Sequence, residues 1–194
     1  MGVLNQSAID AIGFASVGHN VRISDKASFH GADRITVGNN VRIDDFCVLS
    51  AGLGGIVIAE YVHLAVYTAL IGAGRITVSD YCGLSSRVAI YSSNDDYSGA
   101  TMTSPTIPVE FTGVTHADVF LGRHVIVGSG SIILPGVTLE EGVAIGALSL
   151  VNSDCGAFGI YAGNPARRIK ERKRDLLAVE QRFIASLAPT PGAA

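Results

Sequence analysis

The sequence predicts an all-β protein in which short strands wind into a parallel helix of stacked coils. Two observations carry this prediction. Aliphatic residues recur every six positions over most of the 194-residue chain, and glycine is frequent, with 23 residues. Each hexad is a short strand followed by a turn, with an aliphatic residue pointing inward, and three hexads make one triangular coil. A single coil buries little by itself, so several stacked coils must share one core.

The hexads can be followed in order along the chain. "VGHNVR-ISDKAS" begins at Val17, "VGNNVR-IDDFCV" at Val37, "IAEYVH-LAVYTA" at Ile58 and "VSDYCG-LSSRVA" at Val78, and the repeat resumes over 121–150. The starts lie 20 or 21 residues apart, so each coil carries two or three extra residues, in glycine-rich corners. An ordinary β-sandwich is the alternative, but its strands do not keep a six-residue register over so much of the chain.

The two ends of the chain differ from this repeat. Residues 1–13 are expected to form an arm or short helix capped by Ser7. Residues 14–163 form the predicted β-helical domain, with an excursion loop at about 92–119. Residues 164–194 contain a basic segment, a C-terminal helix with apolar residues at helical spacing, and a tail.

Composition excludes several classes of protein. The net charge of −3 and the pI near 5.9 argue against nucleic-acid binding, since such proteins are usually basic. No apolar run approaches the ~18 residues that span a membrane, and we do not expect the first residues to act as a signal peptide, since they lack a basic region and a long apolar run. Three widely spaced cysteines predict neither a disulfide framework nor a zinc site, so we expect a reducing, cytoplasmic location.

The segment "YAGNPARRIKER" at 161–172 opens a run of six basic residues between Arg167 and Arg174. The run is either a solvated helix face or an anion site. The segment and the hexads together resemble the hexapeptide-repeat acetyltransferases, left-handed parallel β-helices that include the galactoside O-acetyltransferases. The motif G-x-P-A-[KR]-x-I lies beside the phosphates of acetyl-CoA in that family, so the resemblance implies that Arg167 and Lys170 contact the cofactor.

Small residues also point to coenzyme A. Its pantetheine arm needs exposed backbone groups and small side chains, which "VGSGS" (127–131) and "IGALS" (145–149) supply about one coil apart. The resemblance places Ser129 and Ala147 along the cofactor, with Asn152 a few residues further on. Every corner of such a repeat favours small residues, so a purely structural role is the alternative.

The excursion interrupts the repeat with polar groups, and a long loop in a compact repeat needs a functional reason. "NDDYSG" contains Asn94, Asp95, Asp96 and Tyr97, which we predict to bind the acceptor substrate. A turn is the simpler interpretation, and calcium binding is weakly supported because the oxygen ligands lack the usual spacing. The resemblance implies that this loop packs against a neighbouring subunit of a homotrimer, where the acceptor binds between subunits.

Acyl transfer to a hydroxyl needs a general base, and histidine suits this role near neutral pH. Relatives that acetylate sugars carry a histidine at the start of the excursion, but Asp95 stands at that position here. Three candidates for the base therefore stay open: His116 at the end of the loop, Asp95 itself, and His63 one coil earlier. His63 occupies the sixth place of its hexad and is alternatively a simple corner residue.

The predicted activity is transfer of an acetyl group from acetyl-CoA to a hydroxyl or amine of a sugar or nucleotide-linked amino sugar, in surface polysaccharide synthesis and without a metal. A serine- or xenobiotic-type acetyltransferase and a non-catalytic scaffold are the alternatives. A γ-class carbonic anhydrase shares the fold, but the close histidine pair of that class is missing from this chain.

Overall fold

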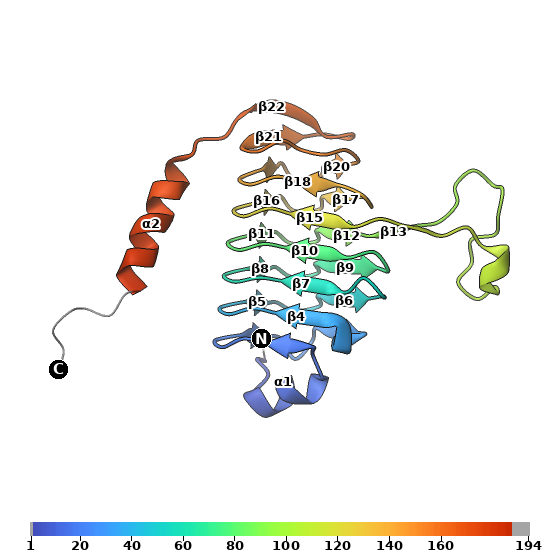
Figure 1. Cartoon of the computed structure of the whole chain (residues 1–194), viewed down its shortest axis with the longest axis horizontal. Coiled ribbons are helices and arrows are strands. Elements are labelled where there is room, and N and C mark those ends of the chain that lie inside the picture. The colour runs from blue at the N-terminus through green and yellow to red at the C-terminus, as the bar shows by residue number, and fades with distance from the viewer. Residues whose placement is uncertain (1, 188–194) are drawn as a thin grey trace.

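The computed structural model describes residues 2–187, which wind into a parallel β-helix with a helix at each end and one long excursion (Figure 1). Three sheets form the sides of the β-helix. The prediction of a left-handed parallel β-helix with an excursion loop and a C-terminal helix is confirmed. Within the described part, no helix is both long and apolar enough to cross a membrane.

Each sheet takes one strand from each full coil, and the second sheet has two further strands at its upper end. The first sheet runs in the order β1 (Ser16–Val17), β4 (Ile35–Val37), β7 (Ile56–Ile58), β10 (Ile76–Val78), β15 (Val119–Leu121) and β18 (Thr138–Leu139). The second runs β2 (Arg22–Ile23), β5 (Arg42–Ile43), β8 (His63–Leu64), β11 (Gly83–Leu84), β16 (Ile126–Val127), β19 (Ala144–Ile145), β21 (Gly159–Ala162) and β22 (Arg167–Glu171). The third contains β3 (Ser28–His30), β6 (Val48–Ala51), β9 (Ala69–Gly72), β12 (Ala89–Tyr91), β17 (Ile132–Ile133) and β20 (Leu150–Val151).

Successive coils pair in register, so equivalent side chains stack along the axis. Val37 pairs with Ile58, which pairs with Val78, and all three are at most 1% exposed. Burying one such side chain contributes about 1.5–3 kcal/mol, and the column continues through every coil. The six-residue aliphatic period therefore builds one continuous core, and it also fixes which outward residues lie side by side on each sheet.

The lower end of the core is covered by α1 (Gln6–Ile12), whose Ile9 is 2% exposed. The predicted cap, Ser7, is wrong: the side chain of Asn5 accepts a hydrogen bond from the backbone N–H of Ala8 at 2.9 Å, and Ser7 lies inside the helix. A short 3₁₀ helix, η1 (Ala32–Arg34), occupies one corner of the next coil.

The upper end is closed by β21 and β22, which pair antiparallel, and the chain then continues into α2 (Asp175–Leu187). This helix packs on the solenoid of its own chain. Glu180 is 8% exposed and accepts a hydrogen bond from His124 Nε2 at 2.8 Å, while the ring of Phe183 meets that of Tyr61 edge-on at 5.2 Å.

The excursion leaves the third sheet after β12 and returns at β15. Its stem is the antiparallel pair β13 (Ser93–Asn94) and β14 (Thr115–His116), and it contains the 3₁₀ helix η2 (Val109–Phe111). Figure 1 shows the excursion projecting from the solenoid on the side opposite α2. The loop therefore extends well beyond the body of its own chain.

Candidate active site

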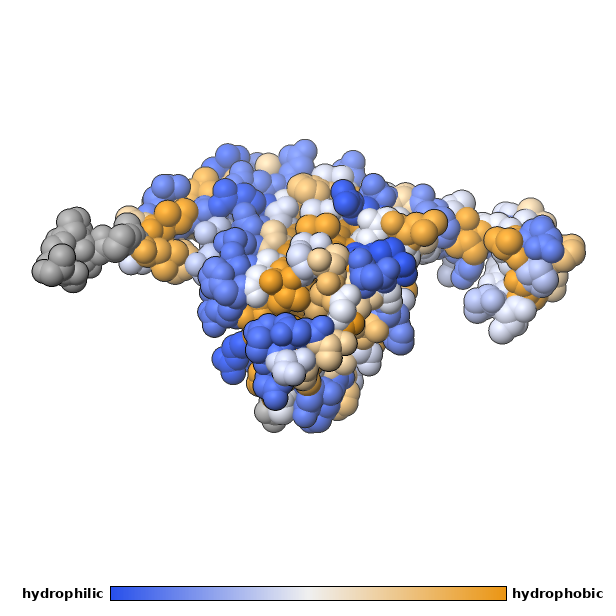
Figure 2. Space-filling model, turned by 60° about the horizontal axis from the view of Figure 1, so that its bottom comes forward, coloured by the Kyte–Doolittle hydropathy of each residue, from blue (hydrophilic) through white to orange (hydrophobic). Residues whose placement is uncertain are grey.

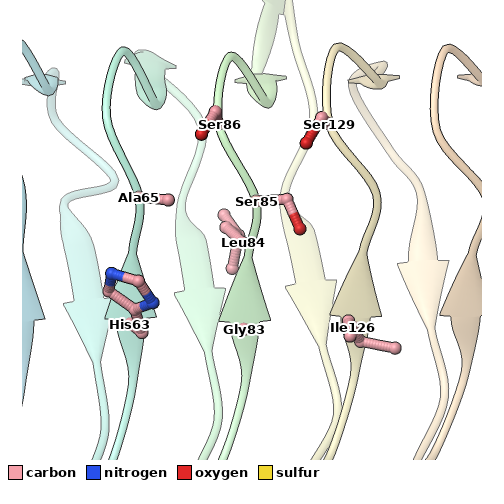
Figure 3. Close-up of a pocket in the computed structure, with 8 residues that line it drawn as sticks. All are labelled: His63, Ala65, Gly83, Leu84, Ser85, Ser86, Ile126 and Ser129. Atoms are coloured by element: carbon pink, nitrogen blue, oxygen red, sulfur yellow. The ribbon is translucent and has the colours of Figure 1, made fainter.

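The first hollow lies on the outer face of the second sheet and has a volume of about 410 Å³ (Figure 3). It is lined by His63, Ala65, Gly83, Leu84, Ser85, Ser86, Ile126 and Ser129. These residues come from β8, β11 and β16 and from the corners that follow them. The hollow is open on one side, where a ligand or a second copy of the chain could complete it.

A ledge of small residues runs upward from this hollow, along the corner that follows the second sheet. The backbone N–H of Ser85 donates to Val127 O at 2.9 Å, that of Gly128 to Ile145 O at 2.8 Å, and that of Gly146 to Tyr161 O at 2.8 Å. A Cβ added to Gly128 would lie 2.4 Å from the nitrogen of Ala147, so only glycine lets the coils approach this closely.

Ser129 and Ala147 follow the two glycines of this ledge, and both are exposed. The backbone N–H of Leu148 donates to Ser129 O at 2.9 Å, which places the two small residues on adjacent coils. The arrangement gives an extended ligand a flat surface with small side chains. Asn152 is also exposed, beyond β20.

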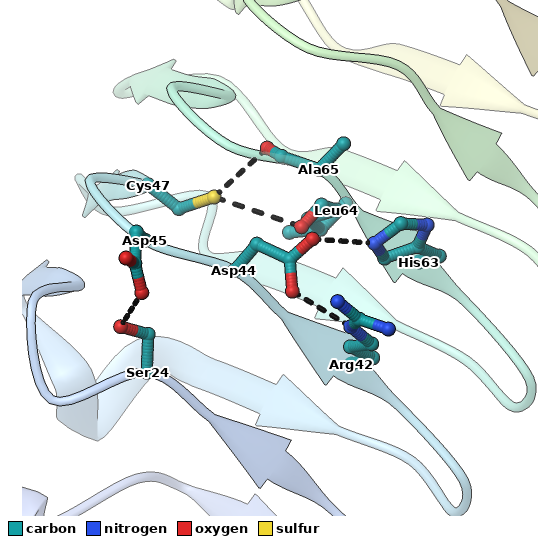
Figure 4. A network of polar contacts seen from close by, with 8 residues as sticks. All are labelled: Ser24, Arg42, Asp44, Asp45, Cys47, His63, Leu64 and Ala65. Atoms are coloured by element: carbon teal, nitrogen blue, oxygen red, sulfur yellow. Dashed lines mark hydrogen bonds and ion pairs between the residues drawn. The ribbon is translucent and has the colours of Figure 1, made fainter. Parts of the chain in front are cut away.

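His63 is not a corner residue, because it lies within β8 with its side chain facing outward, 46% exposed. Its Nε2 hydrogen-bonds Asp44 Oδ2 at 2.8 Å, and Arg42 Nε donates to Asp44 Oδ1 at 2.7 Å (Figure 4). Burial raises the pKa of Asp44, but the hydrogen bonds from His63 and Arg42 outweigh this effect and lower it. The ionised carboxylate holds both side chains in fixed orientations.

A second hollow, of about 370 Å³, lies where the excursion leaves the third sheet. Asn94, Asp95 and Tyr97 line it together with apolar residues of β17 and β20 and the segment between them. The described residues supply no hydrogen bond to the carboxylate of Asp95, which also lines a smaller hollow with Asp96, Tyr97 and Thr103. Asp95 is thus the carboxylate that lines this second hollow, and it is available to a ligand.

Asp96 has a different environment, although it is the next residue. Its carboxylate accepts hydrogen bonds from the backbone N–H groups of Ser98 and Thr101, both at 2.8 Å, and from both hydroxyls. These bonds, led by that of the Ser98 hydroxyl, hold the pKa of Asp96 well below its usual range. The group therefore shapes the start of the excursion.

His116 lies in the stem of the excursion, and neither of the two main hollows includes it. Its Nδ1 is 2.8 Å from the hydroxyl oxygen of Ser93, which in turn accepts the backbone N–H of Ala73 at 2.7 Å. The imidazole thus holds the hydroxyl of Ser93, which links the stem to the corner after β9.

Three of the six basic residues near the C-terminus, Arg167, Arg168 and Lys170, lie on a strand rather than on a helix. Arg167 and Lys170 belong to β22 and are exposed at the upper end of the second sheet. Arg167 Nη1 donates to the carbonyl of Ala166 at 2.9 Å, and Lys170 pairs with Ile160 across the hairpin. Both cationic groups are available to an anion near the upper end of the ledge.

The residues predicted to form the site therefore lie in separate parts of the structure. His63 and Ser129 share the first hollow, Asn94, Asp95 and Tyr97 share the second, and no residue lines both hollows. The sequence reasoning missed Ser85, Ser86, Arg42 and Asp44. The adjacent hydroxyls in "GLSSR", at a corner where the ledge otherwise has Gly and Ala, were the available signal.

Catalysis by a cysteine thiolate or by a bound metal ion finds little support in the described residues. All three cysteines are buried, and burial raises the pKa of Cys82 to about 12 and those of Cys47 and Cys155 to about 11, so none is a thiolate at neutral pH. Between residues 2 and 187, no group of three or more His, Cys, Asp or Glu side chains is placed to hold a metal ion.

Comparison with known proteins gives a clear result, although no family model matches the chain. The chain is 56% identical over 183 residues to the dTDP-4-amino-4,6-dideoxy-D-glucose acyltransferase of Escherichia coli, covering 94% of this chain and 95% of that protein. AntD, an N-acyltransferase from Bacillus cereus, was crystallised with dTDP and 3-hydroxybutyryl-CoA. It is 45% identical, has a TM-score of 0.91, and covers 95% of this chain and 97% of its own.

A more distant structure shares the fold alone. A galactoside acetyltransferase in complex with coenzyme A is 19% identical, with a TM-score of 0.58 over 88% of this chain and 71% of that one. The predicted resemblance to hexapeptide-repeat acetyltransferases is confirmed by these relatives.

Proposed function

This chain belongs to the family of dTDP-amino-sugar acyltransferases within the hexapeptide-repeat enzymes, and we propose that it acylates the 4-amino group of a dTDP-linked 4-amino-4,6-dideoxy sugar. Acetyl-CoA supplies the acyl group. The observation that carries this proposal is the 56% identity to such an acyltransferase over nearly the full length of both chains. The first hollow and the ledge provide a surface on which both substrates can meet.

The reaction places a nucleophilic amine beside a thioester. The amine nitrogen attacks the carbonyl carbon, a C–N bond forms, and negative charge develops on the carbonyl oxygen. The C–S bond then breaks, and overall one proton passes from the amine to the sulfur of coenzyme A. An amine needs less activation than a hydroxyl, so orientation and oxyanion stabilisation supply most of the required effect.

We assign these two tasks to Ser85 and Asp95. The hydroxyl of Ser85 lies in the first hollow, at the lower end of the ledge, where it can donate to the developing oxyanion. Asp95 has an unsatisfied carboxylate among the described residues and can accept a hydrogen bond from the amino group. Solved forms of AntD with bound ligands include variants of one aspartate and of one serine, the same two residue types.

The cofactor is proposed to run along the ledge past Ser129 and Ala147. Its phosphates would then reach Arg167 and Lys170 at the upper end of the second sheet, with Asn152 nearby. Ala162 ends β21 at the upper end of the ledge and pairs with Arg167. It is three coils above Ser85, or roughly 14 Å at the usual strand spacing. The flexible pantetheine arm would bridge this distance.

We also propose a homotrimer in which the active site lies between subunits. The two hollows share no residue within one chain, and the excursion carries exposed apolar side chains, including Val109, which is 82% exposed, and Phe111, which is 57% exposed. Figure 2 shows the excursion standing clear of the body with apolar groups along it. Packing this loop on a neighbour would cover these groups and bring Asp95 to a second chain.

The free, buried state of all three cysteines supports a reducing compartment, so we propose that the enzyme acts in the cytoplasm. Its product is proposed to be a precursor for surface polysaccharide. Neither the location nor the pathway affects the chemistry above.

The decisive experiment measures release of free coenzyme A by the purified chain with acetyl-CoA and dTDP-4-amino-4,6-dideoxyglucose. We expect turnover with this acceptor and none with dTDP-glucose, which lacks the amine. Turnover with dTDP-glucose alone would instead establish an O-acetyltransferase. Replacing acetyl-CoA by 3-hydroxybutyryl-CoA in the same assay determines which acyl group is preferred.

A further inference from the structure

A strip of cationic side chains lies on the outer face of the second sheet and ends at His63, which lines the lower edge of the first hollow. In-register pairing places Arg22 beside Arg42, and Arg42 beside His63. Neighbouring strands are about 4.8 Å apart, and all three side chains are exposed, so they form a continuous ladder. The next position upward is Gly83, which pairs with His63 and lines the first hollow. The strip therefore leads directly into the candidate active site.

Part of the strip is preorganised by Asp44. The side chain of this residue is only 7% exposed, and its two oxygens accept hydrogen bonds from Arg42 and from His63. A buried carboxylate that is satisfied on both sides restricts both cationic side chains. Fixing them in advance reduces the conformational entropy lost when a ligand binds.

The donors that remain are suited to phosphate. Only the Nε of Arg42 is used by Asp44, and the described residues offer no acceptor to its two Nη groups. A guanidinium presents a planar pair of donors that matches two phosphate oxygens. The two arginines outweigh the single charge of Asp44, so the strip has a net positive charge even when His63 is neutral.

The space above the strip is open. A Cβ added to Gly83 would meet no atom within 4 Å, so a bound ring can lie against the backbone of β11. Ser85 follows two residues later at the foot of the ledge. The other basic cluster, on β22, lies at the opposite end of the sheet and is assigned above to coenzyme A.

We propose that Arg22, Arg42 and His63 bind the diphosphate of the nucleotide-sugar acceptor, an inference that rests on the proposed function. The diphosphate and the 4-amino group occupy opposite sides of the hexose ring. With the diphosphate on the strip, the ring lies over Gly83 and the amine reaches Ser85. The two substrates thus enter from opposite ends of the second sheet, each guided by its own cationic group, and meet at the first hollow.

The test uses dTDP and thymidine as probes for binding to the intact protein, measured by titration calorimetry. Arg42→Gln removes the charge but keeps a donor for Asp44, and Arg22→Gln removes the lower end of the strip. Loss of a charge-assisted hydrogen bond should weaken dTDP binding by about 10- to 100-fold for Arg42→Gln. Thymidine, which carries no phosphate, should bind with unchanged affinity, and so should coenzyme A.

The matched control is Lys26→Gln. Lys26 lies at the corner after β2, pairs with Asp45 at 3.3 Å, and stays outside the strip. This variant should bind dTDP like the wild type. An equal loss of dTDP affinity in Lys26→Gln would reveal a general charge effect and overturn the assignment.

Steady-state kinetics separate this proposal from the proposed function. Arg42→Gln should raise the KM of the nucleotide-sugar acceptor with little change in kcat, since the diphosphate contact is the same in ground and transition states. Turnover by the wild type combined with unchanged dTDP binding by Arg42→Gln would refute the strip alone. Absence of both turnover and dTDP binding in the wild type would refute the strip and the proposed function together.

Discussion

The second sheet and the excursion loop both contribute polar side chains to the candidate site, but they position them differently. In the sheet, His63 and Ser85 are placed by backbone pairing with the adjacent coils, so their positions are settled within one chain. In the loop, Asp96 is satisfied by its own neighbours, while Asp95 has no described partner. The sheet positions its side chains through contacts within one chain, whereas Asp95 has no hydrogen-bond partner among the described residues of its own chain.

The largest expected effect comes from substituting Ser85 in the sheet and Asp95 in the loop, the two residues that we assign to the acyl transfer. Ser85→Ala removes the proposed oxyanion donor and should lower kcat by about 10²–10³-fold. Asp95→Asn removes the proposed charge-assisted hydrogen bond to the amine and should lower kcat/KM by about 10- to 100-fold. Glu110→Gln, a change to another loop carboxylate outside both hollows, is the control and should leave the rates unchanged.

The same two variants test whether the regions meet between subunits. When Ser85→Ala and Asp95→Asn chains are co-expressed, random assembly of a trimer leaves roughly a quarter of shared sites with both residues intact. Activity should then rise well above that of either variant alone. No recovery would mean that both residues act within one chain, and the proposed division of the site would be wrong.

A smaller effect is expected at the upper end of the second sheet. Replacing both Arg167 and Lys170 by Ala should raise the KM of acetyl-CoA by about tenfold or more, through loss of phosphate contacts. The KM of the sugar acceptor should not change. Arg182→Ala on α2 provides a control of similar charge. An unchanged KM for acetyl-CoA would remove the basic strand from the cofactor site.

Substitution of His116 by Ala tests whether this side chain acts as the general base or only anchors the loop. A general base would lose about 10²–10⁴-fold in kcat on conversion to Ala. Because Nδ1 of His116 is engaged with Ser93 in the stem, we expect a loss of less than tenfold. A hundredfold loss, with normal thermal unfolding and normal coenzyme A binding, would establish His116 as the base.

The smallest effect concerns the shape of the loop. The pKa of Asp96 is lowered in the folded chain, so its hydrogen bonds stabilise the loop fully above the ordinary value of 3.8. This stabilisation declines as pH falls below 3.8 and is lost as pH falls through the lowered pKa of the folded chain. Asp96→Asn should mimic that loss at neutral pH. We expect faster cleavage within 95–114 during limited proteolysis, at an unchanged unfolding temperature. Equal cleavage rates would contradict a local role for Asp96.

The sequence by itself determined the fold, since a six-residue aliphatic period can bury its side chains only by stacking coils. The ledge followed from the same period: Ser129 and Ala147 could be placed on adjacent coils because register is constant along the solenoid. The glycine-rich corners and the basic segment around Arg167 could likewise be identified from the sequence alone.

Only the tertiary structure decided how the polar residues group together. His63 was ambiguous in sequence because its partner, Asp44, lies on the preceding coil, and that contact depends on the number of extra residues in the intervening corner. Asp95 and Asp96 are adjacent and chemically identical, yet local hydrogen bonds satisfy the carboxylate of Asp96, while residues 2–187 supply none to that of Asp95. A repeat fixes what lies above and below each residue, but the contacts of an irregular loop arise only when the chain folds in three dimensions.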